Sequence, residues 1–311
     1  MIGHVTDPEA EAGLALRALP DPSPAPSDVI VDVRAYAVNR GELNLLRQRP
    51  KGWPPGQDVA GVVAHAAADG TGPRPGTRVV GAADQGGWSQ RVAVPSHRIA
   101  AIPDNVSFAD AAALPVAGLT ALRALRTGGP LLGRRVLITG ASGGVGSFAV
   151  QLASIAGAHV TGLVSGPPRV DAVRALGADD VVTTLEGITE RFDLILDGVG
   201  GRVLVDALHH LAPGGTVAAY GMASGDTSSL AFTVFRGATN GKLIGFFVYA
   251  TDVTTFGEDL SFMARLIGAG RLQIPGPRRD WKETRQAIDL LRQHNATGKV
   301  VLTVGDPPPT S

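Results

Sequence analysis

Three small residues in the segment VLITGASGGVGSFAVQLA (136–153) have the spacing of a turn that binds a dinucleotide. Ala141, Gly143 and Gly146 occupy the three positions of the pattern A-x-G-x-x-G. The first fits a tight turn, the second lets backbone N–H groups approach a pyrophosphate, and the third lets the next helix pack closely on the strand. An apolar strand precedes the turn and an amphipathic helix follows it, so the phosphates should lie at a helix N-terminus. We therefore predict pyrophosphate contacts from Ser142, Gly143, Gly144 and Val145.

The residues after the next expected strand, HVTGLV (159–164), bear on which dinucleotide binds. NAD-binding proteins of this architecture commonly carry a carboxylate there, roughly 20 residues past the glycines, that accepts from the ribose 2′-OH. Ser165 stands at this point, and Arg169 is nearby. Because a hydroxyl and a guanidinium suit a 2′-phosphate, we predict that Ser165 and Arg169 bind NADP(H) rather than NAD(H). The alternative is that Arg169 is a solvated residue in the first turn of a helix.

The elements that position this turn follow from the pattern after Arg135, where apolar strands alternate with helices. Strands are expected at 135–139, 159–164, 180–183, 192–197, 215–220 and 242–248, and helices at 144–156, 168–176 and 201–211. This alternation predicts an α/β fold with a Rossmann doubly wound parallel six-stranded sheet. Segment 229–240 fits a helix or a loop.

Ligands of such sheets bind beyond the carboxyl ends of the strands. The fourth and fifth strands therefore add candidate cofactor-binding residues, namely Asp197, Gly198, Val199, Gly221, Met222 and Ala223.

Residues 1 to about 115 show a different pattern, with short apolar or alternating runs broken by Gly and Pro clusters. This pattern predicts a compact, barrel-like β domain. Residues 113–125 have helical spacing, and helices are also expected at about 255–268 and 281–293. A last strand at 298–304 needs partners, which the N-terminal β domain offers. We therefore predict that 1–115 and 255–311 form one domain and 116–254 the other.

Composition excludes several classes of function. The chain has 311 residues, 28 basic and 28 acidic, so no nucleic-acid or membrane surface is expected. Neither a secretory signal nor an apolar run of membrane-spanning length is visible, and a cytoplasmic protein is the default expectation. The absence of cysteine excludes disulfides, thiolate nucleophiles and sulfur-ligated zinc. The seven histidines show no metal-ligand spacing, so no metal is predicted.

Nine motifs in one order give the chain a family resemblance over nearly its whole length. They are AYAVNRGEL (35–43), PPGQDVAGVV (54–63), GGWSQRVAVP (86–95), AAALPVAGLTA (111–121), the glycine-rich turn, ALGADDVV (175–182), FDLILDGVGG (192–201), LAPGGTVAAYG (211–221) and GKVVL (298–302). The chain resembles the medium-chain dehydrogenase/reductase superfamily, in its zinc-independent quinone oxidoreductase and enoyl reductase branch. The resemblance implies a GroES-like β-rich domain, a Rossmann domain, nicotinamide in the cleft between them, and a homodimer formed through the last Rossmann strand, 242–248.

The resemblance also implies residues near the nicotinamide. Asn39, Gln57 and Thr120 are the candidate catalytic residues, able to offer hydrogen bonds without charge. Alternatively, Asn39 caps a turn and Thr120 is an ordinary helix residue. Asp58 could order its loop through backbone N–H groups, and the role of Glu42 is open.

Two further segments are expected near the cofactor by resemblance. Phe246, Phe247 and Val248 correspond to a segment that lies against nicotinamide, although the phenylalanines could instead pack in a core or dimer interface. Asn295 and Lys299 could reach the cofactor from the returning segment, with a surface or cleft-edge charge as the alternative for Lys299.

The departures from relatives bear on the reaction. Zinc-dependent relatives carry ligands where Asn39 and Gln57 stand, and their four-cysteine lobe is missing here. A carbonyl would lack a Lewis acid, so we predict NADPH-dependent hydride transfer to a conjugated acceptor, a quinone or an α,β-unsaturated carbonyl. Relatives often carry tyrosines where Trp53, Thr183 and Thr184 stand, and Tyr36, the only tyrosine of the first domain, has no assigned direction. No general acid can be named. The alternatives are a non-redox cyclase or isomerase and a cofactor-binding regulatory protein.

Overall fold

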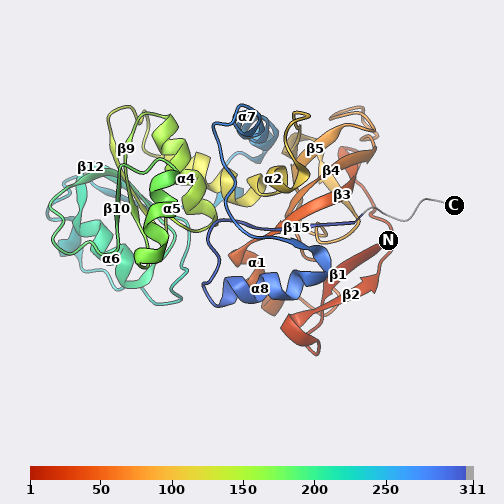
Figure 1. The fold of residues 1–311 in the computed structure, drawn as a ribbon, viewed down its shortest axis with the longest axis horizontal. Helices are drawn as coiled ribbons and strands as arrows, with labels where there is room; N and C mark the ends of the chain where they lie inside the picture. The colour runs from red at the N-terminus through yellow and green to blue at the C-terminus, as the bar shows by residue number, and fades with distance from the viewer. Residues whose placement is uncertain (306–311) are drawn as a thin grey trace. The chain divides into compact units, whose positions relative to one another are not determined.

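The computed structural model describes residues 1–305 and divides into two compact units (Figure 1). The first unit comprises Met1–Leu119 and Asp252–Ser311, and the second is Thr120–Thr251. These divisions lie within a few residues of the boundaries expected from the sequence. The chain thus leaves the first unit, builds the second, and returns.

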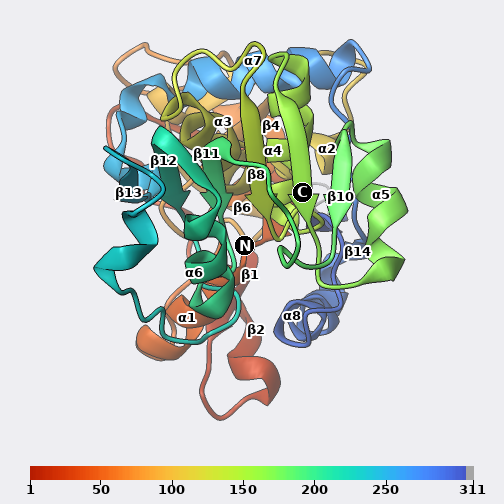
Figure 2. The same ribbon diagram turned by 90° about the vertical axis from the view of Figure 1, so that its left-hand side faces the viewer.

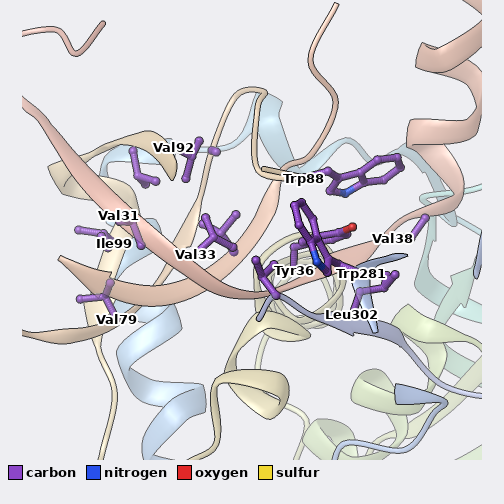
Figure 3. Packing of buried hydrophobic residues seen from close by; sticks show 14 of the residues in the cluster. Val31, Val33, Tyr36, Val38, Val79, Trp88, Val92, Ile99, Trp281 and Leu302 are labelled. Atoms are coloured by element: carbon purple, nitrogen blue, oxygen red, sulfur yellow. The ribbon is translucent and has the colours of Figure 1, made fainter. Parts of the chain in front are cut away.

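The first unit is built on a mixed sheet with the order β14-β15-β3-β4-β5-β7, and β6 pairs with β3. Its strands are β3 (Asp28–Val38), β4 (Asp58–His65), β5 (Arg78–Ala82), β6 (Arg91–Pro95), β7 (Ile99–Ala101), β14 (Arg278–Asp280) and β15 (Val300–Thr303). The returning strand β15 runs antiparallel to β3, with Val300 opposite Val38. Figure 3 shows the core beneath this sheet, where Tyr36, Trp88 and Trp281 lie among valines. The last strand therefore finds its partner in the N-terminal β domain.

Helices of the first unit flank this sheet at its connections. They are α1 (Arg40–Gln48), α2 (Phe108–Ala112), α7 (Phe256–Gly268) and α8 (Thr284–Arg292). The segment expected as one helix at 113–125 is instead a π-helical turn, Leu114–Gly118, that continues directly into α3 (Leu119–Arg126). Such π-turns leave local hydrogen-bonding groups unusually placed and often occur at functional sites.

The second unit contains the Rossmann sheet expected from the sequence (Figure 2). Its six strands are all parallel and have the order β10-β9-β8-β11-β12-β13. Their bounds are β8 (Arg135–Thr139), β9 (His159–Leu163), β10 (Asp180–Val182), β11 (Phe192–Asp197), β12 (Leu211–Ala219) and β13 (Lys242–Gly245). The helices between them are α4 (Gly144–Ile155), α5 (Val170–Ala175) and α6 (Gly201–His209).

Two local features differ from the sequence expectations, and segment 229–240, which fitted a helix or a loop, is mainly a loop. The last Rossmann strand was expected to reach Val248, but β13 ends at Gly245, because its partner β12 ends at Ala219. Segment 229–240 contains one short 3-10 turn, Phe232–Phe235. A hairpin of β1 (Ile2–Thr6) and β2 (Leu14–Ala18) was not expected at all. Within residues 1–305, no helix has both the length and the apolar character needed to cross a membrane.

Candidate functional site

The glycine-rich turn of the second unit has the close backbone packing that a dinucleotide requires. Its chain leaves β8, turns at Gly140 with φ of +60°, and enters α4 at Gly144. A Cβ added to Gly146 would lie 2.3 Å from the carbonyl oxygen of Gly140, so only glycine permits this approach of helix to strand. A Cβ on Gly143 would lie 3.2 Å from the same oxygen. The first-turn N–H groups of α4, at Gly144 and Val145, have no intrahelical acceptor and can donate to phosphate oxygens. The residues present therefore fit the pyrophosphate of a dinucleotide.

Arg169 is directed toward this turn. It lies in a 3-10 turn, Pro167–Arg169, ahead of α5, and its Nη1 donates to Oγ of the buried Ser142 over 3.1 Å. Ser165 is exposed in the loop after β9. The half-buried guanidinium is therefore held beside the predicted phosphate-binding residues, whereas a fully solvated side chain was the alternative.

A buried carboxylate links the end of β8 to the loop after β11, and this loop packs on the loop after β12. Asp197 Oδ1 accepts from Thr139 Oγ1 at 2.6 Å, and Oδ2 accepts from the Gly200 backbone N–H at 2.9 Å. Burial raises the pKa of Asp197. A Cβ on Gly198 would lie 2.6 Å from the ring of Tyr220, so the two loops are packed against each other. Asp197 thus shapes the carboxyl edge of the sheet, with its own oxygens occupied.

The other predicted residues of this unit differ widely in exposure. Phe247 and Met222 are exposed by 65% and 64%, whereas Val248 is buried. Phe246 is partly buried, and its backbone N–H donates to the carbonyl of Ala219 over 2.7 Å. Thr120 is buried on α3, in the second unit, whereas Asn39 and Gln57 belong to the first.

The first unit contains a buried polar cluster formed by Asn39, Glu42, Asp58 and Lys299. Asn39 is the N-cap residue of α1, and its Nδ2 donates to Asp58 Oδ2 at 2.8 Å. The Lys299 ammonium lies 2.7 Å from that carboxylate oxygen and also donates to Asn39 Oδ1. Lys299 is 3% exposed and Asp58 is fully buried, so the ion pair is shielded from water.

Glu42 closes the cluster beneath the start of α1. Its Oε2 accepts from the Asn39 backbone N–H at 2.8 Å, and its Oε1 accepts from the Gln57 backbone N–H at 2.9 Å. Burial, together with the nearby Asp58 carboxylate, raises the pKa of Glu42 to about 8, although these N–H donors and Lys299 oppose the shift. Glu42 therefore fixes the backbone on either side of the two candidate amides.

The cluster changes the interpretation of several sequence predictions. Asn39 has the capping role that was the alternative to a place near the nicotinamide, and Asp58 accepts a backbone N–H, that of Val116, at 2.8 Å. The alternative of a surface charge for Lys299 is wrong, because Asp58 and Asn39 hold it in the interior. Asn295 is exposed, with its amide 3.2 Å from Gln293 Oε1. The sequence reasoning missed the ion pair, although pairing the last strand with β3 would have placed Lys299 next to Asn39.

Tyr36 points into the core. Its hydroxyl lies 2.6 Å from Thr284 Oγ1, its ring stacks on Trp88, and burial raises its pKa. The one tyrosine of the first unit is therefore a structural residue, remote from solvent.

Comparison with known proteins assigns the family. Residues 25–104 match the alcohol dehydrogenase GroES-like domain, and residues 144–265 match the zinc-binding dehydrogenase domain. The chain is 30% identical over 332 residues to a chloroplast envelope quinone oxidoreductase homolog from Arabidopsis thaliana, covering 94% of each protein. The chain belongs to the medium-chain dehydrogenase/reductase superfamily, in its quinone oxidoreductase and enoyl reductase branch.

Other similar proteins cover the fold to different extents. A trans-enoyl reductase from Aspergillus terreus is 38% identical over 202 residues, which are 56% of this chain and 65% of that protein. The spectinabilin polyketide synthase system protein NorB of Streptomyces orinoci is 37% identical over 301 residues, covering 90% of this chain, which spans only 13% of that protein. A mycobacterial protein solved in complex with NADPH shares 26% identity, with a TM-score of 0.85 over 97% of this chain and 99% of the other.

The buried carboxyl of Glu42 yields a prediction about stability. Because its pKa in the folded protein lies above the value of an unfolded chain, the free energy of unfolding should fall as pH rises from about 5 through about 8. Glu42→Gln removes this titration. Relative to the variant, the wild type should therefore lose on the order of a few kcal/mol of unfolding free energy as pH rises over that range. Chemical denaturation at a series of pH values measures it.

A matched control is available in the 3-10 turn Trp281–Glu283, directly before α8. Glu283 has the same capping-box role as Glu42, but its side chain is 42% exposed. Glu283→Gln should show no comparable pH-dependent difference. Parallel pH profiles for wild type and Glu42→Gln would contradict the prediction.

Proposed function

We propose that the chain is a zinc-independent, NADPH-dependent oxidoreductase that delivers hydride to a quinone or an α,β-unsaturated carbonyl compound. The observation that carries the proposal is the turn between β8 and α4, where Gly146 packs on Gly140 and Arg169 is held on Ser142. The NADPH-bound mycobacterial structure and the quinone and enoyl reductase relatives support it.

The residues of the second unit have distinct binding roles in this proposal. Ser142 and the N–H groups of Gly144 and Val145 bind the pyrophosphate. Gly143, whose own N–H donates to the Gly140 carbonyl at 2.9 Å, lets the phosphates approach the backbone because it has no side chain. Ser165 and Arg169 bind the 2′-phosphate, for which a planar guanidinium is well suited. Gly198, Val199, Gly221, Met222 and the segment 246–248 line the carboxyl edge for the rest of the cofactor. The cofactor, when bound, supplies the hydride.

The candidate catalytic residues have no formal charge. Gln57 is the better donor toward an acceptor oxygen, because its half-buried side chain takes no part in the buried polar cluster. Asn39 is engaged within that cluster, because its Nδ2 donates to Asp58 and Glu42 and its Oδ1 accepts from Lys299, so it offers a ligand mainly the position of its backbone. Thr120 contributes a hydroxyl from α3.

Zinc independence rests on the chemistry of the side chains. Amides stand at positions 39 and 57, and the sequence contains no thiolate. Within residues 1–305, no group of three or more His, Asp or Glu side chains is placed to hold a metal ion. A conjugated acceptor spreads the developing negative charge over its own atoms, so the reaction needs no metal.

The activity is tested directly by titration and turnover. Binding of NADPH should change the protein fluorescence. The absorbance of NADPH should then fall as it is oxidised, when a small quinone or enone is added. Turnover on at least one acceptor of the panel, unaffected by a strong zinc chelator, is the expected result. Binding without turnover would favour the non-redox or regulatory alternatives, and no binding would remove the cofactor assignment.

The preference for NADPH depends on Arg169. Arg169→Ala should weaken NADPH binding roughly 10- to 100-fold, the loss of a charge-assisted contact to phosphate, and leave NADH binding nearly unchanged. The control is Arg174→Ala, which removes an exposed arginine paired with Asp171 at 3.1 Å on the neighbouring helix. Equal weakening of both cofactors by Arg169→Ala would contradict the 2′-phosphate role.

We further propose that two chains form a homodimer through β13. This strand is an edge of the Rossmann sheet, where Leu243 is 36% exposed, and Phe247, two residues beyond its end, is 65% exposed. An apolar unpaired edge favours strand pairing with another copy. Light scattering should give twice the mass of one chain, and Leu243→Lys should lower it, whereas Leu132→Lys, at a residue 83% exposed elsewhere in this unit, should not. A wild-type mass of one chain would exclude the dimer.

A further inference from the structure

The ion pair between Lys299 and Asp58 is unusual in its surroundings. The two side chains are exposed by 3% and 0%, and their charged atoms are 2.7 Å apart. Removing two charges from water is costly, so a buried ion pair is weak evidence for stability. The role of the pair therefore depends on which neighbouring groups it holds in place.

The ammonium of Lys299 has a defined set of acceptors. It donates to Asp58 Oδ2, to Asn39 Oδ1, and to the carbonyl oxygen of Val38 over 3.4 Å. An ammonium has three N–H donors, so each one is matched and none remains for a ligand. Lys299 is consequently placed to act on its neighbours and not on a cofactor or substrate.

The pair fixes the amide of Asn39 in one orientation. The oxygen of the amide faces the ammonium, and its Nδ2 faces Asp58 at 2.8 Å and Glu42 at 3.4 Å. A flipped amide would direct N–H groups at the ammonium and its oxygen at two carboxyl groups. Electrostatics therefore selects a single geometry.

The same pair connects the segments that carry the other site residues. Asp58 directly follows Gln57, and its Oδ1 accepts from the Val116 N–H in the π-helical turn at 2.8 Å. That turn continues into α3, the helix with Thr120. The cluster thus links the N-terminus of α1, the start of β4 and the π-helical turn to the returning C-terminal segment.

We propose that Lys299 is a positioning residue, which holds Asn39, Gln57 and the π-helical turn in the geometry required for hydride transfer without touching the cofactor. The inference rests on the function proposed above and deepens it. Misplacement of reacting groups by an ångström costs about 100-fold in rate, so a loosened cluster should affect turnover more than binding.

The test compares three variants in the full-length protein. Lys299→Met removes the ammonium, and Lys299→Met combined with Asp58→Asn removes both charges and so avoids an unpaired buried carboxylate. Lys51→Met is the matched control, because the Lys51 side chain is 56% exposed and pairs with the exposed Glu9 at 2.6 Å. Its second partner, Asp7, lies at 3.3 Å and keeps an ion pair with Arg17 at 3.2 Å in the variant. Each variant is measured for kcat, for NADPH Kd, for melting temperature, and for hydrogen–deuterium exchange.

The expected result separates turnover from binding. Lys299→Met should lower kcat roughly 10- to 100-fold while NADPH Kd stays within about threefold of wild type. Amide exchange should rise in peptides covering 38–46 and 112–119, and remain unchanged in α4 of the second unit. The double variant should regain the melting temperature but not kcat. Lys51→Met should match wild type throughout.

Other outcomes overturn the inference. A fall in NADPH affinity equal to the fall in kcat would mean that Lys299 contacts the cofactor. Recovery of kcat in the double variant would reduce its role to charge balance, and unchanged exchange in both peptides would remove the positioning role. If the wild type binds NADPH but reduces no acceptor, the proposed function fails, and the exchange measurement alone decides the inference.

Discussion

The first unit depends on one buried carboxylate, that of Asp58. Its oxygens accept hydrogen bonds from the Asn39 amide and the Val116 backbone N–H, and they pair with the Lys299 ammonium. These three donors come from segments far apart in the chain. A carboxylate in this dry environment is tolerated only with such partners, because its desolvation is otherwise uncompensated. The return of the chain after the second unit is therefore more than the addition of a strand to the sheet. The returning segment also contains Lys299, whose charge offsets that of Asp58 and so allows the start of β4 to be buried beside the N-terminus of α1.

The second unit also buries a carboxyl group, but without a cation beside it. Asp197 ends β11, and its partners are neutral donors, the Thr139 hydroxyl and the Gly200 backbone N–H. Burial raises the pKa of this carboxyl, since no opposite charge offsets the loss of water. In each unit a buried acidic residue at a strand end organises a neighbouring turn. These carboxyl groups are structural, and the side chains that would contact a ligand in the proposed function are mainly small or uncharged, with Arg169 as the exception.

The sequence predicted what local sterics and periodicity determine. Gly146 was predicted because a helix can approach a strand so closely only at glycine, and the parallel sheet because strands and helices alternate. The direction of the Tyr36 side chain could not be predicted, because residues 35–38 of β3 are all buried. Polar and apolar residues therefore do not alternate there, and the sequence does not indicate which face each side chain is on. Nothing in the sequence around Lys299 indicates that it is buried, because its buried partner is Asp58, which is distant in the sequence. The end of β13 depends on where its partner strand ends.

The charges of the buried polar cluster are consistent with the proposed chemistry. Hydride transfer adds negative charge to the acceptor, and an uncompensated carboxylate close beneath it would oppose that change. Lys299 offsets Asp58, and Glu42, with a pKa of about 8, is largely protonated at neutral pH. Asn39 and Gln57 are therefore supported by a cluster with little net charge, although it contains two carboxyl groups. The acidic residues can fix the backbone by accepting N–H groups, while the field at the amides remains nearly neutral.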